Sequence, residues 1–410
     1  MQTLQTDITI IGAGPAGTSA ALSLADSGLK VLLIDQARFP RDKICGDALS
    51  GKVFSELNRL LPDFKKRVLP IPTASASWGI RFFSPSARVL DVPYKQTPSY
   101  QPADSPSFVL ERELFDHLLF STVKEQKSIL IQEECRLTQV NKITQGWKLD
   151  TSTGSIETKL LIDASGATSI LAREKYPFKS SPKHLSIGLR QYFKGVTDCQ
   201  EHGFLELHYL KSVLPGYAWI FPLGNGKVNV GIGMLSTDAK KRKESLNQIF
   251  TRFLQHPFIR NRFQLAEPLE SPKGFSLPFG SLRRKVSGDH YLMTGDAAGL
   301  IDPFTGEGIA NAITSGRLAA EQALACFGSN QFDGNYMRTY DQKLFNKIGA
   351  ELALSHKLQR LGRYPFLLDY MIRKAAGNQA IQQLFTSMFE EVDVREYLSK
   401  PSFYLKLLFS

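Results

Sequence analysis

A glycine-rich turn close to the N-terminus constrains the fold of this chain more than any other feature of the sequence. Residues 7–11 are apolar and β-branched and indicate a strand, and an alanine-rich helical pattern covers residues 18–27. Between them, residues 12–17 have the G-x-G-x-x-G spacing, in which the glycines permit a tight turn, close approach of a pyrophosphate and close helix–strand packing. The following helix N-terminus offers free N–H groups to phosphates. The pattern therefore predicts a dinucleotide site that includes Gly12, Gly14, Ala16 and Gly17.

An acidic residue follows the next strand at the distance that such a site requires. Residues 30–34 indicate a second strand, which ends in Asp35 with Gln36 beside it. A carboxylate at this position accepts hydrogen bonds from a ribose 2′-hydroxyl, which favours FAD or NAD over NADP. We therefore add Asp35 and Gln36 to the cofactor-binding set. The alternative is a glycine-rich turn in some other α/β protein.

Charge and cysteine usage limit the partners and the compartment. The 410 residues carry a formal net charge of +11, which favours an anionic partner such as nucleic acid, an acidic membrane surface or a phosphorylated ligand. The four cysteines are widely spaced, and no His or Cys cluster has metal-ligand spacing, so we expect neither disulfides nor a metal site. The N-terminus lacks the features of a signal peptide, and no apolar run is long enough to span a membrane. We expect a cytoplasmic protein.

Two further motifs lie far along the chain. Residues 291–299 read Y-L-M-T-G-D-A-A-G, and residues 301–309 read I-D-P-F-T-G-E-G-I before a long helical pattern. Small residues there would let the helix begin close to a planar ring, with its positive end near a reduced flavin. A third strand pattern, residues 160–167, ends in small residues. These segments add the following cofactor-binding candidates: Ser165, Gly166, Gly295, Asp296, Pro303, Gly306, Gly308 and Ile309.

Together these motifs resemble those of the superfamily of FAD-dependent monooxygenases and geranylgeranyl reductases, over roughly residues 7–325. The resemblance implies that FAD is the cofactor, that Asp296 holds its ribityl chain, and that Arg112 lies near it. A solvated helix charge is the alternative for Arg112. Aromatic hydroxylases of the superfamily carry Asp-Gly where this chain has Ser165-Gly166, which argues against that activity.

Two segments resemble the geranylgeranyl reductase group in particular. Residues 39–47 read F-P-R-D-K-I-C-G-D, like a loop that runs beside the flavin ring in that group. The resemblance implies a cofactor-binding role for Arg41 and both cofactor-binding and catalytic roles for Cys45 and Gly46. A small apolar filler is the alternative for Cys45. Residues 217–233 resemble the Y-x-W-x-F-P…G-x-G signature, in which strand alternation puts three aromatic residues on one face. Substrate-binding roles are thereby implied for Tyr217, Trp219, Phe221, Pro222, Gly231 and Gly233, with an ordinary aromatic core as the alternative.

These observations predict an α/β protein, in which a Rossmann-type FAD-binding domain is interleaved with a mostly antiparallel β-sheet substrate domain and followed by a C-terminal helical region. We assign residues 1–70, 103–170 and 275–330 to the FAD-binding domain. Residues 71–102 and 171–274 form the substrate domain, and residues 331–410 the helical region.

The expected activity is reduction of carbon–carbon double bonds in an isoprenoid or similar apolar substrate, by hydride transfer from reduced flavin. NAD(P)H or an electron-transfer protein would be the reductant, and nucleic acid is not an expected partner. Two alternatives remain open at this point: a flavin-dependent monooxygenase or halogenase acting on an aromatic or polyketide-like substrate, and a non-catalytic flavoprotein that carries lipid or electrons. Peripheral contact of the apolar tail, residues 401–409, with an anionic membrane also remains open.

Overall fold

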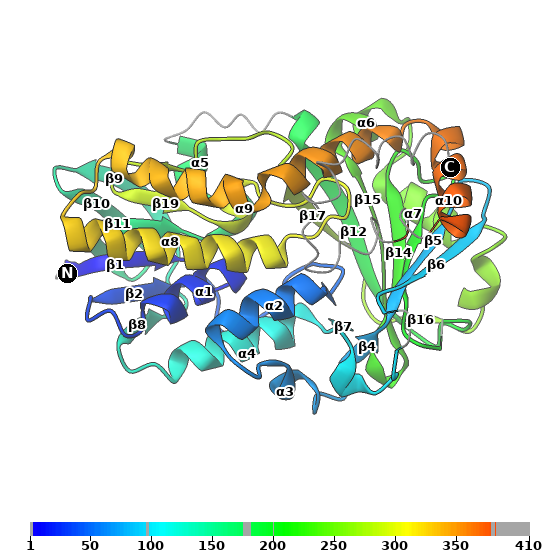
Figure 1. Ribbon diagram of the computed structural model, residues 1–410, viewed down its shortest axis with the longest axis horizontal. Helices are drawn as coiled ribbons and strands as arrows, with labels where there is room; N and C mark the ends of the chain where they lie inside the picture. Colours follow the sequence, from blue (N-terminus) through cyan, green and yellow to red (C-terminus); the bar gives the residue numbers. More distant parts are fainter. Residues whose placement is uncertain (1–2, 96–97, 175–181, 200, 379–381, 383–410) are drawn as a thin grey trace. The chain divides into compact units, whose positions relative to one another are not determined.

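The structure is a computed structural model that describes residues 3–95, 98–174, 182–199, 201–378 and 382 (Figure 1). The chain forms two compact units, each assembled from three separate segments. Unit 1 contains the described residues up to Lys43, then Glu113–His184 and Leu277–Leu352. Unit 2 contains Ile44–Arg112, Leu185–Ser276 and the described residues from Ala353 onward.

The core of unit 1 is a sheet whose central strands are parallel. The strand order is β18-β19-β11-β1-β2-β8, and β10 pairs with β11 and β9 beside this path. Buried isoleucine and leucine residues fill the middle of the sheet, where Ile8 pairs with Leu160 and Ile10 with Leu33. Such nearly continuous apolar strands are typical of parallel sheets covered on both faces. The strands are β1 (Leu4–Ile11), β2 (Val31–Ile34), β8 (Ile129–Gln132), β9 (Leu137–Ile143), β10 (Gly146–Thr151), β11 (Gly154–Asp163), β18 (Ser287–Gly288) and β19 (Tyr291–Met293).

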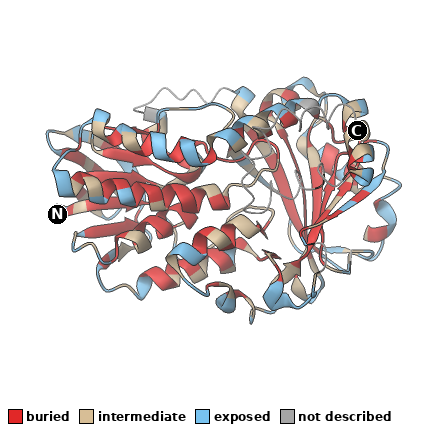
Figure 2. Ribbon diagram, in the orientation of Figure 1, coloured by how far each residue is buried: buried red, intermediate tan, exposed pale blue. Residues whose placement is uncertain are grey.

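Small residues allow two helices of unit 1 to pack closely. A Cβ atom added to Gly316 of α8 would lie only 2.1 Å from the carbonyl oxygen of Ala16 in α1. Figure 2 shows α1 and α8 largely in the colour of buried residues, as the central strands are. The helices with residues in unit 1 are α1 (Pro15–Leu24), α4 (Arg112–Lys124), α5 (Ile170–Glu174), α8 (Ile309–Ser329) and the first part of α9 (Gly334–Leu361).

Unit 2 is built on a mixed, mostly antiparallel sheet. Its strand order is β16-β12-β15-β14-β13-β5-β6, with β17 beside β12, and only β13 and β5 pair in parallel among the described pairings of this sheet. The strands are β5 (Gly79–Phe83), β6 (Val89–Pro93), β12 (Leu185–Lys194), β13 (Leu205–His208), β14 (Tyr217–Pro222), β15 (Lys227–Leu235), β16 (Glu267–Pro268) and β17 (Lys273–Pro278).

One face of this sheet forms a hydrophobic core with α7 (Leu246–Leu254). Ala218 and Ile220 of β14 belong to that core, together with Ile249 and Phe253 of the helix. A small second sheet has the order β3-β7-β4. The remaining elements of unit 2 are β3 (Ala48–Leu49), β4 (Ser75–Ser77), β7 (Ser107–Val109), α2 (Gly51–Leu60), α3 (Lys65–Val68), α6 (Ser236–Lys241) and α10 (Pro365–Gly377).

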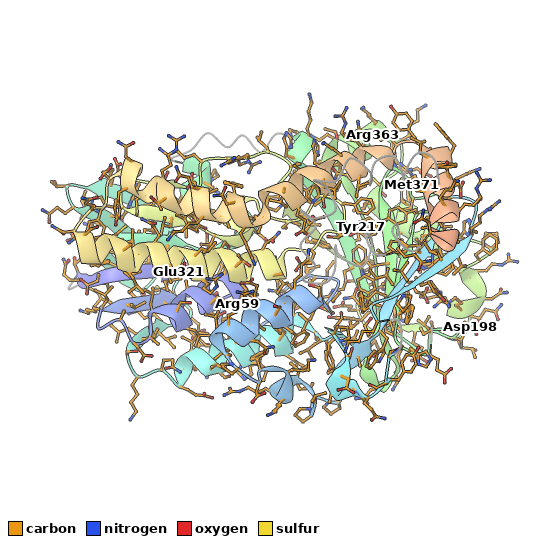
Figure 3. The ribbon with its side chains drawn as sticks, in the orientation of Figure 1. Arg59, Asp198, Tyr217, Glu321, Arg363 and Met371 are labelled. Carbon is orange, nitrogen blue, oxygen red and sulfur yellow. The ribbon has the colours of Figure 1, made fainter. Side chains whose placement is uncertain are left out.

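The C-terminal helical region is tied to unit 2 by polar contacts. Arg363, which follows α9 and is labelled in Figure 3, forms an ion pair with Asp238 of α6 at 3.2 Å. Asp369 of α10 accepts hydrogen bonds from the hydroxyl groups of Ser84 and Ser86 at 2.5 and 2.6 Å. These contacts order α10 on unit 2.

The predicted fold class is confirmed: a parallel Rossmann-like sheet, a mostly antiparallel second sheet and C-terminal helices are all present. The assigned domain boundaries stay a prediction. None of the helices in the described part of the chain is long and apolar enough to cross a bilayer. The tail discussed above, residues 401–409, lies outside the described residues.

Candidate functional site

The glycine-rich turn of unit 1 requires glycine for two different reasons. A Cβ atom on Gly17 would lie 1.8 Å from the carbonyl oxygen of Gly12, and one on Gly12 would lie 2.5 Å from that of Ala164. Gly12 also has a φ of +96°, which favours glycine. Around Gly14, by contrast, an added Cβ atom would meet only the Nη2 atom of Arg41, at 3.6 Å. Gly12 and Gly17 therefore accommodate the backbone, whereas Gly14 has only the Arg41 side chain beside its Cβ position, which is compatible with close approach of a ligand.

The helix that follows the turn presents an uncapped N-terminus beside this space. Helix α1 begins at Pro15, three residues earlier than the alanine-rich pattern indicates, because proline is favoured in the first turn where its missing N–H costs nothing. Gly14 is the N-cap residue and supplies no side-chain acceptor, and the first turn, which contains Ala16 and Gly17, has no acidic residue. This arrangement suits the binding of a phosphate anion.

Asp35 lies at the end of β2 and holds the turn in place. Its Oδ2 atom accepts a hydrogen bond from the Ala13 N–H at 2.8 Å, and its Oδ1 atom accepts one from the Ala37 N–H at the same distance. Each carboxylate oxygen has a second lone pair with which to accept a further hydrogen bond. Gln36 beside it is exposed.

Arg41 supplies a positive charge near Gly14. Its Nη1 atom forms an ion pair with the fully buried Asp116 side chain at 3.0 Å, and its guanidinium carbon lies 4.7 Å from the centre of the Phe39 ring. Both contacts restrict the guanidinium group, which leaves the Nη2 atom facing Gly14.

The turn at the end of residues 160–167 lies beside the glycine-rich turn within unit 1. Asp163, at the end of β11, accepts hydrogen bonds from the Ser165 N–H at 3.0 Å and from the hydroxyl groups of Ser165 and Ser169, both at 2.5 Å. Burial raises the pKa of Asp163, and these hydrogen bonds partly oppose that effect. The Asp163 carboxylate thus fixes the turn, and nothing lies within 4 Å of a Cβ atom added to Gly166, which has a φ of +77°.

The segment of residues 291–309 also packs against the glycine-rich turn, at Ala16. A Cβ atom on Gly295 would lie 3.3 Å from both the Ala16 and the Ala312 Cβ atoms, and one on Gly308 would lie 3.6 Å from Oδ1 of the partly exposed Asp296. The turn before α8 is held by Asp302, whose Oδ1 atom accepts from the N–H groups of Phe304 and Thr305. The remaining candidates of this turn are the buried Pro303 and Ile309 and the partly exposed Gly306.

Unit 1 therefore brings the glycine-rich turn and Asp35 together with two segments, residues 160–167 and 291–309, each more than a hundred residues further along the chain than the motif before it. The glycine at position 14, the uncapped N-terminus of α1 and the adjacent Arg41 guanidinium fit the pyrophosphate of a dinucleotide such as FAD. Asp35 and Asp296 are carboxylates that could accept hydrogen bonds from hydroxyl groups of such a ligand, and their cofactor-binding roles stay a prediction.

The aromatic residues of the second signature lie on one face of β14 in unit 2. The ring centres of Tyr217 and Trp219 are 6.1 Å apart, and those of Trp219 and Phe221 are 6.3 Å apart. Figure 3 shows Tyr217 on the sheet of this unit. Ala218 and Ile220, which alternate with them, face the hydrophobic core. The strand thus gives one face to the core and presents a row of three aromatic rings on the other, with the partly exposed Pro222 at its end.

The two signature glycines have distinct surroundings. A Cβ atom on Gly231 would lie 2.2 Å from the Cζ2 atom of Trp219, so the indole ring lies across β15 at this position. A Cβ atom on Gly233 would make only an ordinary contact of 3.8 Å with the same ring. The absence of a side chain at Gly231 therefore makes room for the Trp219 ring, whereas Gly233 has room for a small side chain beside the same ring.

The loop with Cys45 and Gly46 packs against this aromatic row. A Cβ atom on Gly46 would lie 3.1 Å from a ring carbon of Phe221 and 3.5 Å from the Nε1 atom of Trp219. Burial raises the pKa of the half-buried Cys45 thiol, against the opposing effect of the nearby Arg112 guanidinium. Arg112 is only 7% exposed, so it is not a solvated helix charge. The protonated Cys45 thiol of the loop therefore lies near a buried cation, the Arg112 guanidinium.

Three polar residues to which the sequence analysis gave no role lie behind this loop: Asp47, Tyr192 and Asn229. Asp47 directly follows the Cys45-Gly46 pair. Asn229 alternates with Gly231 and Gly233, which would have placed it on the same face of its strand. This alternation was the signal in the sequence that could have identified Asn229 as a site residue. The hydrogen bond between Asn229 and Asp47 could not be predicted, because it depends on tertiary structure.

Comparison with known proteins gives consistent results. Residues 186–273 match the family described as geranylgeranyl reductase catalytic domain, and residues 7–186 match the family described as FAD dependent oxidoreductase. The chain is 32% identical over 374 residues to a menaquinone reductase of Mycobacterium tuberculosis, which covers 88% of this chain and 85% of the relative. It is 29% identical over 347 residues to digeranylgeranylglycerophospholipid reductase 1 of Methanosphaera stadtmanae, covering 83% and 80% of the two chains.

A solved structure shares the whole fold. The crystal structure of a geranylgeranyl bacteriochlorophyll reductase-like protein from Thermoplasma acidophilum superposes with a TM-score of 0.81, at 22% identity, and covers 97% of this chain and 100% of that one. At this identity the likeness supports the fold, while the sequence matches carry the family assignment.

Proposed function

The chain belongs to the geranylgeranyl reductase family of FAD-dependent oxidoreductases, and we propose that it reduces double bonds in the polyprenyl tail of a quinone or polar lipid. Its relatives are named for menaquinone and for digeranylgeranylglycerophospholipid, which both carry long isoprenoid chains. The observation that carries this proposal is the aromatic row Tyr217, Trp219 and Phe221, which offers an apolar surface for a hydrocarbon chain. The Cys45–Gly46 loop packs directly on this row, so a chain bound there would lie near the Cys45 thiol.

The residues of unit 1 would hold the cofactor. Gly12, Gly14 and Gly17 shape the turn, the N-terminus of α1 and Arg41 would bind the pyrophosphate, and Asp296 would bind the ribityl chain. When bound and reduced, FAD supplies the hydride for the reaction. NAD(P)H or an electron-transfer protein remains our proposal for the reductant.

The aromatic row would bind the substrate chain. Aromatic side chains offer a large apolar contact area with few rotatable bonds, so they bind a flexible hydrocarbon with little ordering cost of their own. Tyr217 is partly exposed at one end of the row and Phe221 is buried at the other. A row of this shape fits an extended chain better than a compact ring system.

Cys45 would supply the proton that completes the reduction. Hydride addition to one alkene carbon leaves the neighbouring carbon in need of a proton, and a thiol with a raised pKa is protonated at neutral pH. The thiol would give this proton to carbon and regain one from solvent. Gly46 would let the loop lie flat against Phe221 while the transfer occurs.

The test is an assay of the FAD-loaded protein with reduced flavin and two substrates, menaquinone and a geranylgeranylated glycerophospholipid. We expect mass spectrometry to show products heavier by two hydrogen atoms for each double bond reduced. Tight binding of either lipid without any saturated product would instead support a lipid carrier. Substrate-stimulated oxygen consumption with an oxygenated product would support a monooxygenase.

A further inference from the structure

Asp47 is fully buried in unit 2 and receives hydrogen bonds from three directions. The Tyr192 hydroxyl donates to its Oδ2 atom at 2.5 Å, the Asn229 Nδ2 atom donates to the same oxygen at 2.7 Å, and the Arg112 N–H donates to Oδ1 at 3.2 Å. The residue has a φ of +67°, which is uncommon outside glycine. A strained backbone that is held by three hydrogen bonds indicates a position fixed for a purpose.

Asn229 connects Asp47 to both parts of the candidate site in unit 2. Its Nδ2 atom also donates to the carbonyl oxygen of Cys45 at 2.8 Å, and its Oδ1 atom accepts from the Trp219 Nε1–H at 2.9 Å. A single fully buried amide thus bonds to the loop and to the central ring of the aromatic row. Hydrogen bonds in such a buried network are strong, and a broken one is costly.

We propose that Asp47, Tyr192 and Asn229, here called the Asp47 cluster, are positioning residues that hold the Cys45–Gly46 loop against Trp219, and that they do so when Asp47 is ionised. The inference rests on the proposed function only for the importance of the loop in catalysis. The arrangement itself follows from the contacts within unit 2.

The contacts explain why the ionised form matters. All three groups donate to the Asp47 carboxylate, so protonation of the carboxyl would add a fourth donor, and either the Tyr192 hydroxyl would have to turn its hydrogen away and accept or one of the bonds would break. Burial raises the pKa of Asp47 to about 6, while the hydrogen bonds from Tyr192 and Asn229 and the charge of Arg190 lower it. The cluster would therefore loosen as the pH falls through this value.

Two neighbouring acids, the Cys45 thiol and the Tyr192 hydroxyl, do not share this behaviour. The Cys45 thiol and the Tyr192 hydroxyl have pKa values raised by burial, so they stay protonated, and arginine keeps its charge. Lys227 lies over the Tyr192 ring and pairs with Glu111, and Arg190 lies over the same ring and pairs with Glu270. The groups that face the cluster are Cys45, Glu111, Arg112, Arg190, Tyr192, Lys227 and Glu270.

A pH profile of kcat for the FAD-loaded enzyme tests the inference. We expect wild-type kcat to fall below a pH of about 6, and Asp47→Asn to lack this inflection, with kcat roughly tenfold lower at neutral pH, which corresponds to about 1.4 kcal/mol. Tyr192→Phe should move the inflection to higher pH, because it removes a hydrogen bond that lowers the Asp47 pKa. The matched control is Tyr291→Phe, which removes a buried hydroxyl from unit 1 and should leave the profile unchanged.

Alkylation of Cys45 tests the same inference without any turnover. Peptide mass spectrometry gives the rate at Cys45 relative to Cys199, which is also half-buried. We expect Asp47→Asn and Asn229→Ser to raise this ratio roughly tenfold and Tyr291→Phe to leave it unchanged. Unchanged ratios, or an inflection near pH 6 that persists in Asp47→Asn, would overturn the inference. If the ratios change but wild type saturates no prenyl chain, the proposed function fails and the positioning role stands.

Discussion

The two units use closely spaced glycines for opposite purposes. In unit 1, Gly12 and Gly17 make room for the backbone, whereas a Cβ atom added to Gly14 would meet only the Arg41 Nη2 atom. In unit 2, Gly231 makes room for the indole ring of Trp219, a side chain of the protein itself. The same short G-x-G pattern thus belongs to the turn proposed to bind the cofactor in one unit, and makes room for an aromatic side chain in the other. A substitution should therefore affect cofactor binding in the first case and the shape of the aromatic row in the second.

Gly17→Ala should have the largest effect, because the added methyl group would lie 1.8 Å from the Gly12 carbonyl oxygen, where nothing can move aside cheaply. We expect a loss of about 3 kcal/mol or more in the free energy of unfolding, together with loss of bound FAD. Urea denaturation and the flavin absorbance of the purified protein measure the two effects. Gly328→Ala is the control, since nothing lies within 4 Å of its added Cβ atom, and a stable protein with full FAD content for Gly17→Ala would contradict the account.

Asp47→Asn should change how stability depends on pH. An acid whose pKa rises from 3.8 to about 6 on folding contributes stability that is present below the unfolded-state pKa and is lost as the pH rises through about 6. The free energy of unfolding of wild type relative to Asp47→Asn should therefore fall by up to about 3 kcal/mol between about pH 4 and pH 7. Urea denaturation of both proteins at several pH values measures this difference. A difference that is constant with pH would show that Asp47 has no raised pKa.

Gly231→Ala should disturb unit 2 without affecting the cofactor. The methyl group would overlap the Trp219 ring, and displacing the ring should cost about 2 kcal/mol and most of the turnover. Tryptophan fluorescence, urea denaturation and FAD affinity distinguish this from general unfolding, since FAD affinity should not change. Gly233→Ala is the matched control, because its methyl group would lie 3.8 Å from the same ring, and equal effects of both variants would break the comparison.

Gly14→Ala should have the smallest effect on folding. Its backbone conformation is one that alanine adopts readily, and the nearest atom to the added methyl group is the Arg41 Nη2 atom at 3.6 Å. The methyl group would occupy the space proposed for the pyrophosphate, so we expect a roughly tenfold higher Kd for FAD, about 1.4 kcal/mol. Titration of the apoprotein with FAD measures the Kd. An unchanged value would place the pyrophosphate elsewhere.

The sequence predicted the parts of the fold that depend on local patterns. The G-x-G-x-x-G turn, the long helix after Gly308 and the alternation of aromatic residues along β14 each follow from the spacing of a few neighbouring residues. Strand alternation correctly puts Tyr217, Trp219 and Phe221 on one face, because successive side chains of a strand point to opposite sides.

The sequence could not predict contacts that depend on distant strands. Asp47 bonds to residues 145 and 182 positions away, and no local pattern distinguishes it from an exposed loop aspartate. The seat of Trp219 on Gly231 likewise depends on the pairing of β14 with β15. The backbone hydrogen bonds of Asp35 were also beyond the motif, which indicates only that a carboxylate is needed there.

A single-turnover experiment without oxygen tests the central claim most directly. The FAD-loaded protein is reduced chemically, mixed with menaquinone or a geranylgeranylated lipid, and followed by flavin absorbance and product mass. Our account predicts that one flavin is reoxidised for each double bond saturated, and that Cys45→Ala and Gly231→Ala slow this step while Gly328→Ala does not. Flavin that stays reduced with either lipid bound, or that is reoxidised without a saturated product, would contradict the account.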